Sequence, residues 1–359
     1  MKSLRRSVLE EAVIATGFLA AFWYAYYFTA IWGLVDHLQE GPMKDYVTGP
    51  GIHLEMIISG LGLGLAVAVV GHLSDIPSLR RRSLGSIILV KTGLYLAATV
   101  VVAGVINAIF LSFLFTPSEW MEVFSLLWPR LGLSLWALFI VSILATNFIL
   151  EVRRKVGPGN LWALLSGRYH RPRDEDRVFL FLDLKGSTTI TERLGHARYS
   201  QFLRACYHDL TDSILLFHAQ VYQFVGDEVV LTWPTRRVEA GRQSIETFFA
   251  FRSRLQERKE WYEANFGVAP EFRGGIEGGV VTATEVGDIK REIAFHGEPL
   301  NTAARLLELC REYGQPVLVS GRIQASLSGD RSLSTEFRGE VTLRGKREPV
   351  AVYGVIQAA

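Results

Sequence analysis

The chain has 359 residues, a net charge of +2 and 49% hydrophobic residues, with a mean hydropathy of +0.21. That hydropathy is high for a soluble protein, and the length allows two or more domains, so a single small soluble domain is excluded. Apolar residues concentrate in the first 150 residues, whereas the remainder has the mixed composition of a globular domain. The sequence therefore divides into a membrane part and a soluble part.

Four apolar stretches in the first part have the length of about 20 residues that crossing a bilayer requires. They cover residues 8–35, 54–73, 84–115 and 124–150. The first is too long and too rich in Trp and Tyr for a signal peptide, so we expect a retained anchor. Lys91, near the start of the third stretch, is expected to extend to the membrane interface. Residues 1–150 are thus predicted to form an α-helical membrane domain with four spans.

The distribution of basic residues predicts the orientation of these spans. Three basic clusters precede the first span, separate the second from the third and follow the fourth: Lys2, Arg5 and Arg6; Arg80, Arg81 and Arg82; Arg153, Arg154 and Lys155. Positive residues favour the cytoplasmic side. Four spans place all three clusters there, so both termini and the soluble domain are expected in the cytoplasm of a multi-pass protein of the plasma or inner membrane.

In the reducing cytoplasm, Cys206 and Cys310 are expected to be structural thiols.

Residues 151–175 are predicted to be a juxtamembrane linker. GPGN at 157–160 breaks the last helix, LWALLSG at 161–167 is expected to form a short amphipathic turn at the membrane surface, and a charge-rich segment leads away from it. Such a segment fits either a spacer held near anionic membrane lipid or a relay between membrane and enzyme.

The soluble part alternates strand and helix patterns. An apolar run at 178–184 predicts a buried strand, and helical spacing follows over 189–217. Two apolar runs around Gly226, Asp227 and Glu228 predict a hairpin. A charged helix (238–265), a glycine-rich strand (272–286), a helix (301–314) and three closing strands complete the domain. This order predicts an α+β fold with helices on a largely antiparallel sheet.

Two acidic residues are placed to hold a metal ion. Asp183 ends a buried strand, where an unpaired carboxylate is costly, and Asp227 lies at the hairpin turn. Gly186, Ser187 and Thr188 open the next helix and offer main-chain N–H groups to a phosphate. Carboxylates beside a phosphate loop would hold Mg²⁺ against a nucleoside triphosphate. Taken alone, a strand-end aspartate and a turn aspartate without any chemistry explain these residues equally well.

Later polar residues favour the nucleotide interpretation. Asn301 and Arg305 are four residues apart and so share one face near the start of a helix. An amide and a guanidinium there suit a ribose and a phosphoryl group. Arg273, on the glycine-rich strand, is placed to approach phosphates, and Arg344 and Lys346 form a further basic pair.

Five motifs in this order resemble those of the class III adenylyl and guanylyl cyclases. They are FLDLKGST, FVGDE, FRGGIEGG, HGEPLNTAARL and LRGKREPVAVYGV. The resemblance covers about residues 176–357. It implies a ferredoxin-like α+β catalytic domain of the class III cyclase type over residues 176–359.

The resemblance also implies a mechanism. Asp183 and Asp227 would bind two Mg²⁺ or Mn²⁺ ions, assisted by the carbonyl of Leu184, and the ribose 3′-oxygen would attack the α-phosphate in line. Asn301 would orient the ribose and Arg305 would stabilise charge on the α-phosphoryl group. Because metal residues and the Asn/Arg pair come from opposite subunits in this family, a homodimer with two composite sites is implied.

The remaining positions concern the polyphosphate and the base. By the resemblance, Arg273 and Lys346 would neutralise the phosphates. The positions that read the base hold Gln223 and Ala294, where adenylyl cyclases of the family usually have Lys and Asp or Thr. Glutamine pairs with either purine and alanine reads nothing with its side chain. ATP is expected as the substrate from family frequency and cellular abundance, with GTP as the alternative.

Three competing functions are weighed against this one. A diguanylate cyclase would need GGDEF, but Val225 and Val229 replace two of its residues, which leaves Glu228 as a local feature of the turn. A catalytically silent nucleotide-binding receptor module would be expected to lack one of the residues named above. A channel or transporter is disfavoured because the spans show no acidic pairs or polar stripe.

The four spans are expected to dimerise and to position the catalytic domains. A ligand of the membrane domain is possible but not identified by the sequence, and no nucleic acid is expected as a partner.

Overall fold

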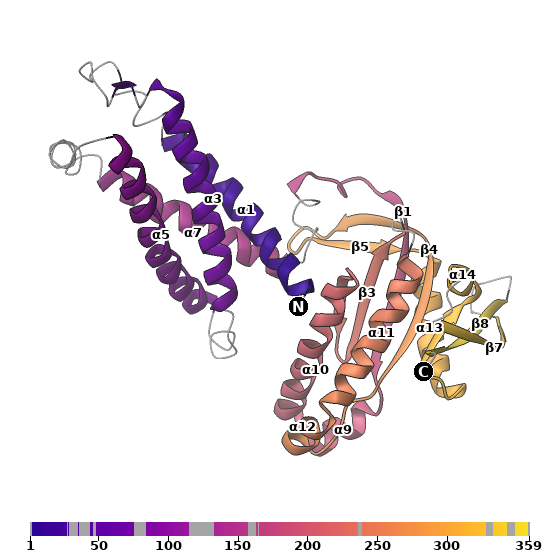
Figure 1. Ribbon diagram of the computed structural model, residues 1–359. Helices are drawn as coiled ribbons and strands as arrows, with labels where there is room; N and C mark the ends of the chain where they lie inside the picture. The colour runs from indigo at the N-terminus through magenta and orange to yellow at the C-terminus, as the bar shows by residue number, and fades with distance from the viewer. Residues whose placement is uncertain are drawn as a thin grey trace. The chain divides into compact units, whose positions relative to one another are not determined.

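The structure is a computed structural model of the chain (Figure 1). It forms two compact units, a helical unit (Met1–Val156) and a sheet unit (Gly157–Ala359). The described residues are 2–26, 28, 35, 44–45, 48–74, 84–114, 133–156, 163, 165–235, 239–327, 333–342 and 349–357.

Four long helices make up most of the described helical unit. They are α1 (Lys2–Tyr26), α3 (Pro50–Leu73), α5 (Leu84–Leu114) and α7 (Leu133–Val156). Helix α1 packs along α3, α3 packs along α5, and α7 contacts both α5 and α1. A Cβ added to Gly64 would lie 1.9 Å from Thr16 Oγ1, so the backbones of α1 and α3 approach closely at this glycine.

Two helical segments of this unit are long and apolar enough to cross a membrane. They are Pro50–Leu73 and Gly85–Ile106, whereas the apolar segments Ala12–Phe22 and Ile140–Val152 are shorter. The described residues therefore support two candidate spans where hydropathy predicted four, because parts of the first and fourth stretches, 29–34 and 124–132 among them, lie outside the described residues. The cluster at 80–82, on which the predicted orientation depends, also lies outside them.

Lys91 pairs with a carboxylate of α7, a contact that the sequence did not predict. It is 2% exposed, and its Nζ lies 2.9 Å from Glu151 Oε1 of α7. Beside this pair, the Asn147 amide nitrogen donates to Thr92 Oγ1 at 2.9 Å. A buried ammonium is tolerated when a carboxylate compensates its lost hydration, and α7 supplies that carboxylate. The contact between α5 and α7 therefore includes an ion pair and a polar hydrogen bond, although the sequence showed no polar stripe along these segments.

The sheet unit is built on one eight-stranded sheet. Its strands are β1 (Arg173–Leu184), β2 (Gln220–Val225), β3 (Glu228–Pro234), β4 (Phe272–Val286), β5 (Glu292–His296), β6 (Val317–Ser320), β7 (Leu333–Val341) and β8 (Val350–Gln357). The order is β2-β3-β1-β4-β6-β8-β7, with β5 paired to β4. Only the β4–β6 pair is parallel among the described strands, so the largely antiparallel α+β fold predicted for this part is confirmed.

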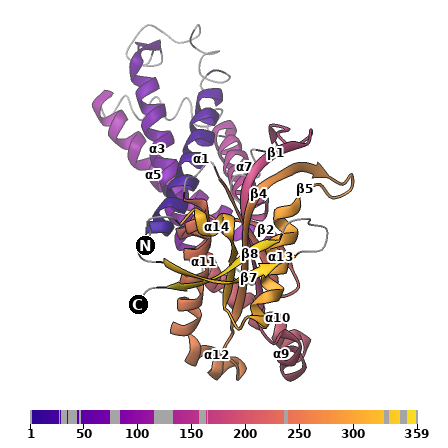
Figure 2. The ribbon, with the colours of Figure 1, turned by 90° about the vertical axis from the view of Figure 1, so that its right-hand side faces the viewer.

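Helices cover both faces of this sheet (Figures 1 and 2). Helices α10 (His196–Leu216) and α11 (Ala240–Glu257) lie on one face, and α13 (Glu298–Glu312) lies on the other. Strand β1 contributes side chains to the hydrophobic core on each face of the sheet. Leu180 and Leu182 pack toward α10 and α11, while Phe179 and Phe181 pack toward α13. A central strand buried on both faces needs a continuous apolar run, which is the pattern seen in the sequence.

The helix boundaries differ from those predicted. The helix expected over 189–217 is two helices, α9 (Ser187–Leu194) and α10, separated by Gly195, whose positive φ of 73° glycine adopts without strain. The helix expected over 238–265 is α11 followed by α12 (Lys259–Phe266). Strand β5 and the short α14 (Gly321–Ala325) were not predicted, because segments of five residues carry too little periodicity to detect.

The two cysteines are free and buried, as expected for structural thiols. Burial is the main cause that raises the pKa of each thiol to about 12, so neither is reactive at neutral pH.

Gly275→Ala should destabilise the sheet unit, because α13 lies directly on β4 at this residue. The added Cβ would lie 2.2 Å from the Ala303 carbonyl oxygen and 2.4 Å from the Leu307 amide nitrogen. Overpacking of this kind costs about 1–3 kcal/mol, so thermal unfolding followed by circular dichroism should show a lower midpoint. Gly321→Ala is the matched control, since its nearest neighbour would be Ala351 Cβ at 3.5 Å. Equal midpoints for the two variants would contradict the close packing of α13 on β4.

Candidate active site

Two aspartates meet at one end of the central strands. Asp183 is the next-to-last residue of β1, and Asp227 lies in the two-residue turn between β2 and β3. The turn is tight because Gly226 adopts a left-handed conformation with φ of 63°, which glycine adopts without strain. Glu228, the first residue of β3, is paired in register with Asp183. The turn therefore brings Asp227 close to Asp183.

The electrostatics of this pair are unfavourable without a cation. Burial is the largest cause that raises the pKa of Asp183 to about 6, and the charge of Asp227 is the next. Glu228 adds further repulsion, and its own pKa is raised by burial and by Asp227. From the sequence, Glu228 was expected to be only a local feature of the turn. The strand register makes it a third acidic group facing Asp183.

This acidic cluster fits a divalent cation. A dication relieves the repulsion between converging carboxylates and prefers oxygen ligands. The described residues contain no complete group of three His, Cys, Asp or Glu side chains arranged for a metal. Asp183 and Asp227 would therefore need further oxygens from main-chain carbonyls, water or a phosphate. Leu184, the predicted carbonyl ligand, ends β1 beside them.

A short loop beside the aspartates leads into α9. Gly186 adopts a left-handed conformation with φ of 72°, and Ser187 begins the helix. Within the described residues no side chain caps this helix start, which leaves main-chain N–H groups for an anion. Thr188 is exposed, and the loop is anchored by a hydrogen bond from the Lys185 amide to the Glu271 carbonyl at 2.8 Å. The loop thus opens a helix as predicted, and phosphate binding there stays a prediction.

Two tyrosines of α10 support these residues and were not identified from the sequence. The Tyr207 hydroxyl donates to the Gly226 carbonyl at 3.2 Å, which holds the turn that carries Asp227. Burial and the charge of Asp227 raise the pKa of the Tyr199 hydroxyl, which places this side chain near the acidic cluster. The only sequence signal is their separation of about two helical turns, which places both toward the same side of a helix.

The two candidate base-reading positions lie beside a bonded aromatic pair. The Phe295 main-chain nitrogen donates to the Tyr222 hydroxyl at 3.3 Å, and the ring centroids are 5.1 Å apart. Gln223 follows Tyr222 in β2, and Ala294 precedes Phe295 in β5. A bulge in β2 between Val221 and Gln223 shifts the register there, and Gln223 is exposed. The structure therefore brings these two predicted positions into one neighbourhood.

Asn301 and Arg305 lie on the exposed side of α13, as their spacing predicts. The Arg305 guanidinium forms an ion pair with Glu308, one turn further along the helix. In the described part of the chain, no hydrogen bond or ion pair joins Asn301 or Arg305 to Asp183 or Asp227. Within one chain the predicted site residues thus form two separate groups.

The two remaining predicted residues have different outcomes. Arg273 is half-buried on β4 and paired in register with Asp183, so its backbone lies beside the acidic cluster. Lys346 falls within residues 343–348, which lie outside the described residues, so its role stays a prediction.

A family model connects this arrangement to known enzymes. Residues 170–357, just over half of the chain, match the adenylate and guanylate cyclase catalytic domain. The chain therefore belongs to the class III nucleotidyl cyclase family and carries its catalytic domain.

Relatives and solved structures agree with this family. Adenylate cyclase 2 of Rhizobium meliloti is 34% identical over 217 residues, which are 59% of this chain and 60% of that protein. An uncharacterized protein of Mycobacterium tuberculosis is 28% identical over 181 residues, or 50% of this chain and 30% of that protein. A solved bacterial light-regulated adenylyl cyclase matches with a TM-score of 0.52 at 18% identity, covering 63% of this chain and 66% of that one, which supports the fold. The chain thus spans 30–60% of the length of these two curated relatives.

Asp227→Asn should lower the pKa of Asp183 from about 6 toward its ordinary value, because a like charge is removed while burial remains. In the metal-free wild type, protonated Asp183 stabilises the fold, and that contribution is lost as the pH rises through about 6. Asp227→Asn should weaken this loss. Infrared titration of the carboxyl bands measures the pKa, with Asp288→Asn on an exposed loop as control. An unchanged titration in Asp227→Asn would show that the two carboxylates do not interact.

Proposed function

We propose that the protein is a membrane-anchored adenylate cyclase that converts ATP to 3′,5′-cyclic AMP and pyrophosphate for signalling. The ribose 3′-oxygen attacks the α-phosphorus in line and pyrophosphate leaves, so no covalent protein intermediate forms. The observation that carries this proposal is the Asp183–Asp227 pair beside the uncapped start of α9, within a cyclase catalytic domain.

Each part of the site has a distinct task in this reaction. The main-chain amides of Gly186, Ser187 and Thr188 bind the polyphosphate, and Arg273 offsets its charge. A divalent cation such as Mg²⁺ or Mn²⁺, held by Asp183 and Asp227, would neutralise phosphate charge and lower the pKa of the 3′-hydroxyl. Positioning and electrostatic stabilisation then supply the catalysis.

The other half of the site comes from a second copy of the chain in this proposal. Asn301 orients the ribose, and Arg305 stabilises negative charge on the α-phosphoryl group in the transition state. Both side chains are exposed on α13, and Arg305 reaches Glu308 of its own helix, so a partner can approach this surface. A symmetric homodimer would then contain two composite sites.

The choice of ATP rests on the similarity to a protein named adenylate cyclase. Gln223 offers both a donor and an acceptor, so a guanylate cyclase is the alternative. A silent nucleotide-binding receptor module is disfavoured because Asp183, Asp227, Asn301 and Arg305 are all present. Anchoring by the helical unit is supported by its two candidate spans.

The first test is product formation by the detergent-solubilised full chain, supplied separately with ATP and GTP and with Mg²⁺ or Mn²⁺. We expect cyclic AMP as the main product, identified by chromatography and mass spectrometry. Asp227→Ala should reduce turnover by at least about a hundredfold, because the acidic pair is lost. Asp288→Ala, an exposed acidic residue outside the site, is the control. Wild-type turnover in Asp227→Ala would exclude this residue from the site, and predominant cyclic GMP would establish the alternative.

The second test concerns the composite site. Asp227→Ala and Arg305→Ala should each be inactive alone, since each removes one residue from both sites of a homodimer. Co-expressed in equal amounts, they should recover about one quarter of wild-type turnover, because half of the dimers are mixed and each mixed dimer has one intact site. Co-expression of Asp227→Ala with Asp183→Ala is the control and should recover nothing, because both changes fall on the same half of the site. Absence of recovery in the first pair would contradict a site shared between subunits.

A further inference from the structure

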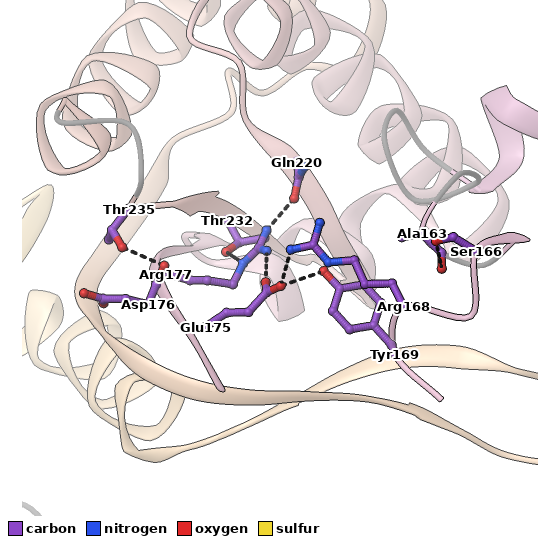
Figure 3. Close-up of polar contacts among 10 residues, drawn as sticks. All are labelled: Ala163, Ser166, Arg168, Tyr169, Glu175, Asp176, Arg177, Gln220, Thr232 and Thr235. Atoms are coloured by element: carbon purple, nitrogen blue, oxygen red, sulfur yellow. Dashed lines mark hydrogen bonds and ion pairs between the residues drawn. The ribbon is translucent and has the colours of Figure 1, made fainter. Parts of the chain in front are cut away.

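One arginine of the sheet unit is fully buried and has no role in the reaction proposed above. Arg177 lies in β1 and is 3% exposed (Figure 3). Its Nε donates to Thr232 Oγ1 of β3 at 3.1 Å, and one terminal nitrogen donates to Glu175 Oε2 at 2.9 Å. The other terminal nitrogen donates to the Gln220 side-chain oxygen at the start of β2. A single guanidinium therefore joins the first three strands of the sheet.

The same guanidinium also contacts β5. Its Cζ lies 4.6 Å from the centroid of the Phe295 ring, within range for a cation–π interaction. Phe295 in turn bonds Tyr222, so Arg177 contacts both strands that carry the base-reading positions. Gln220 is three residues before Gln223 in β2, and Phe295 is next to Ala294 in β5.

Glu175 connects this cluster to the chain segment that follows the helical unit. Its Oε1 accepts from Arg168 at 2.8 Å and from the Tyr169 hydroxyl at 3.1 Å. Burial opposes ionisation of Glu175, but the hydrogen bonds and charge of Arg177, together with Tyr169 and Arg168, outweigh it and lower its pKa. The Tyr169 carbonyl accepts from the Glu285 amide of β4 at 2.8 Å. Residues 168–170 are thus bonded to the sheet, although the sequence predicted a charged segment leading away from the membrane.

The geometry of this cluster makes it sensitive to a conservative change. A buried guanidinium is stable only when its lost hydration is replaced by well-placed acceptors, and Arg177 has three acceptors and an aromatic ring. Lysine keeps the positive charge, but its compact ammonium sits on a flexible side chain. It therefore cannot donate to three acceptors in the fixed planar arrangement of the guanidinium. Arg177→Lys should therefore loosen Gln220 and Phe295 relative to each other without removing the positive charge beside Glu175.

We infer that Arg177 is a positioning residue for the nucleotide base. It holds β2 and β5 together so that Gln223 and Ala294 face the base in one arrangement, and Glu175 ties that arrangement to residues 168–170. This inference rests on the proposed function, since the base is that of the nucleotide substrate. It adds that discrimination between purines depends on the relative position of two strands as well as on the side chains that face the base.

The protein offers a matched control for a change at Arg177. Arg258, between α11 and α12, donates to buried Asp209 at 2.5 Å, and its Cζ lies 4.1 Å above the Trp261 ring. Like Arg177, it contacts a carboxylate and an aromatic ring, but these partners lie on α10 and α12. Arg258→Lys should destabilise the domain without moving β2 or β5.

The experiment compares the full-length wild type with Arg177→Lys, Gln220→Met and Arg258→Lys. The measurements are kcat and KM for ATP and GTP, the Kd of a non-hydrolysable ATP analogue, and the melting temperature. We expect Arg177→Lys to raise KM and Kd by roughly three- to thirtyfold, as misplacement of a binding group does. kcat should change less, and the preference between ATP and GTP should become smaller. Gln220→Met, a milder change, should shift KM and Kd in the same direction.

Four outcomes decide the inference. Unchanged KM, Kd and purine preference in folded Arg177→Lys and Gln220→Met would overturn it. Equal changes in Arg258→Lys at a similar loss of melting temperature would also overturn it, because general destabilisation would then explain them. A wild type that binds the analogue but forms no cyclic nucleotide would reject the proposed function alone, and the Kd comparison would still decide the role of Arg177. A wild type that does not bind the analogue would overturn both.

Discussion

Repulsion between two half-buried carboxylates is the constraint on which the candidate site depends. Asp183 and Asp227 come from elements that the fold forces together, since β1 and β3 are paired up to Asp183 and Glu228. Burial and like charge raise the pKa of Asp183 to about 6, so the metal-free arrangement carries unfavourable electrostatic energy. The apolar packing of β1 on both faces supplies the free energy that holds this pair in place.

The rest of the sheet unit can be understood as support for that pair and for a nucleotide beside it. Tyr207 donates to the turn that carries Asp227, and Tyr199 lies near the same aspartate. Gly275 lets α13 lie directly against β4, which turns Asn301 and Arg305 outward. The carboxylates and the Asn/Arg pair thus form two separate groups within one chain, which is why we propose that a second copy of the chain completes the site.

Local patterns in the sequence predicted much of this architecture. The apolar run of β1, the hairpin around Gly226, the glycine-rich β4 and the four-residue spacing on α13 are properties of neighbouring residues, and they were predicted correctly. Strand β5, the break at Gly195 and the burial of Lys91 against Glu151 were not. Strand β5 is too short to show a period, the break depends on the backbone conformation of Gly195, and the Lys91–Glu151 pair joins segments that are distant in the sequence.

The sequence by itself therefore determined the order of the elements and which polar residues share one turn, one loop or one helix face, because spacing within single elements sets both. Only the tertiary structure decided which of these residues meet. It placed Glu228 opposite Asp183 and brought Tyr222 of β2 to Phe295 of β5. It also buried Arg177 among three strands and an aromatic ring. Strand register and the pairing of distant strands set these contacts, and they depend on the packing of the whole sheet rather than on any local pattern.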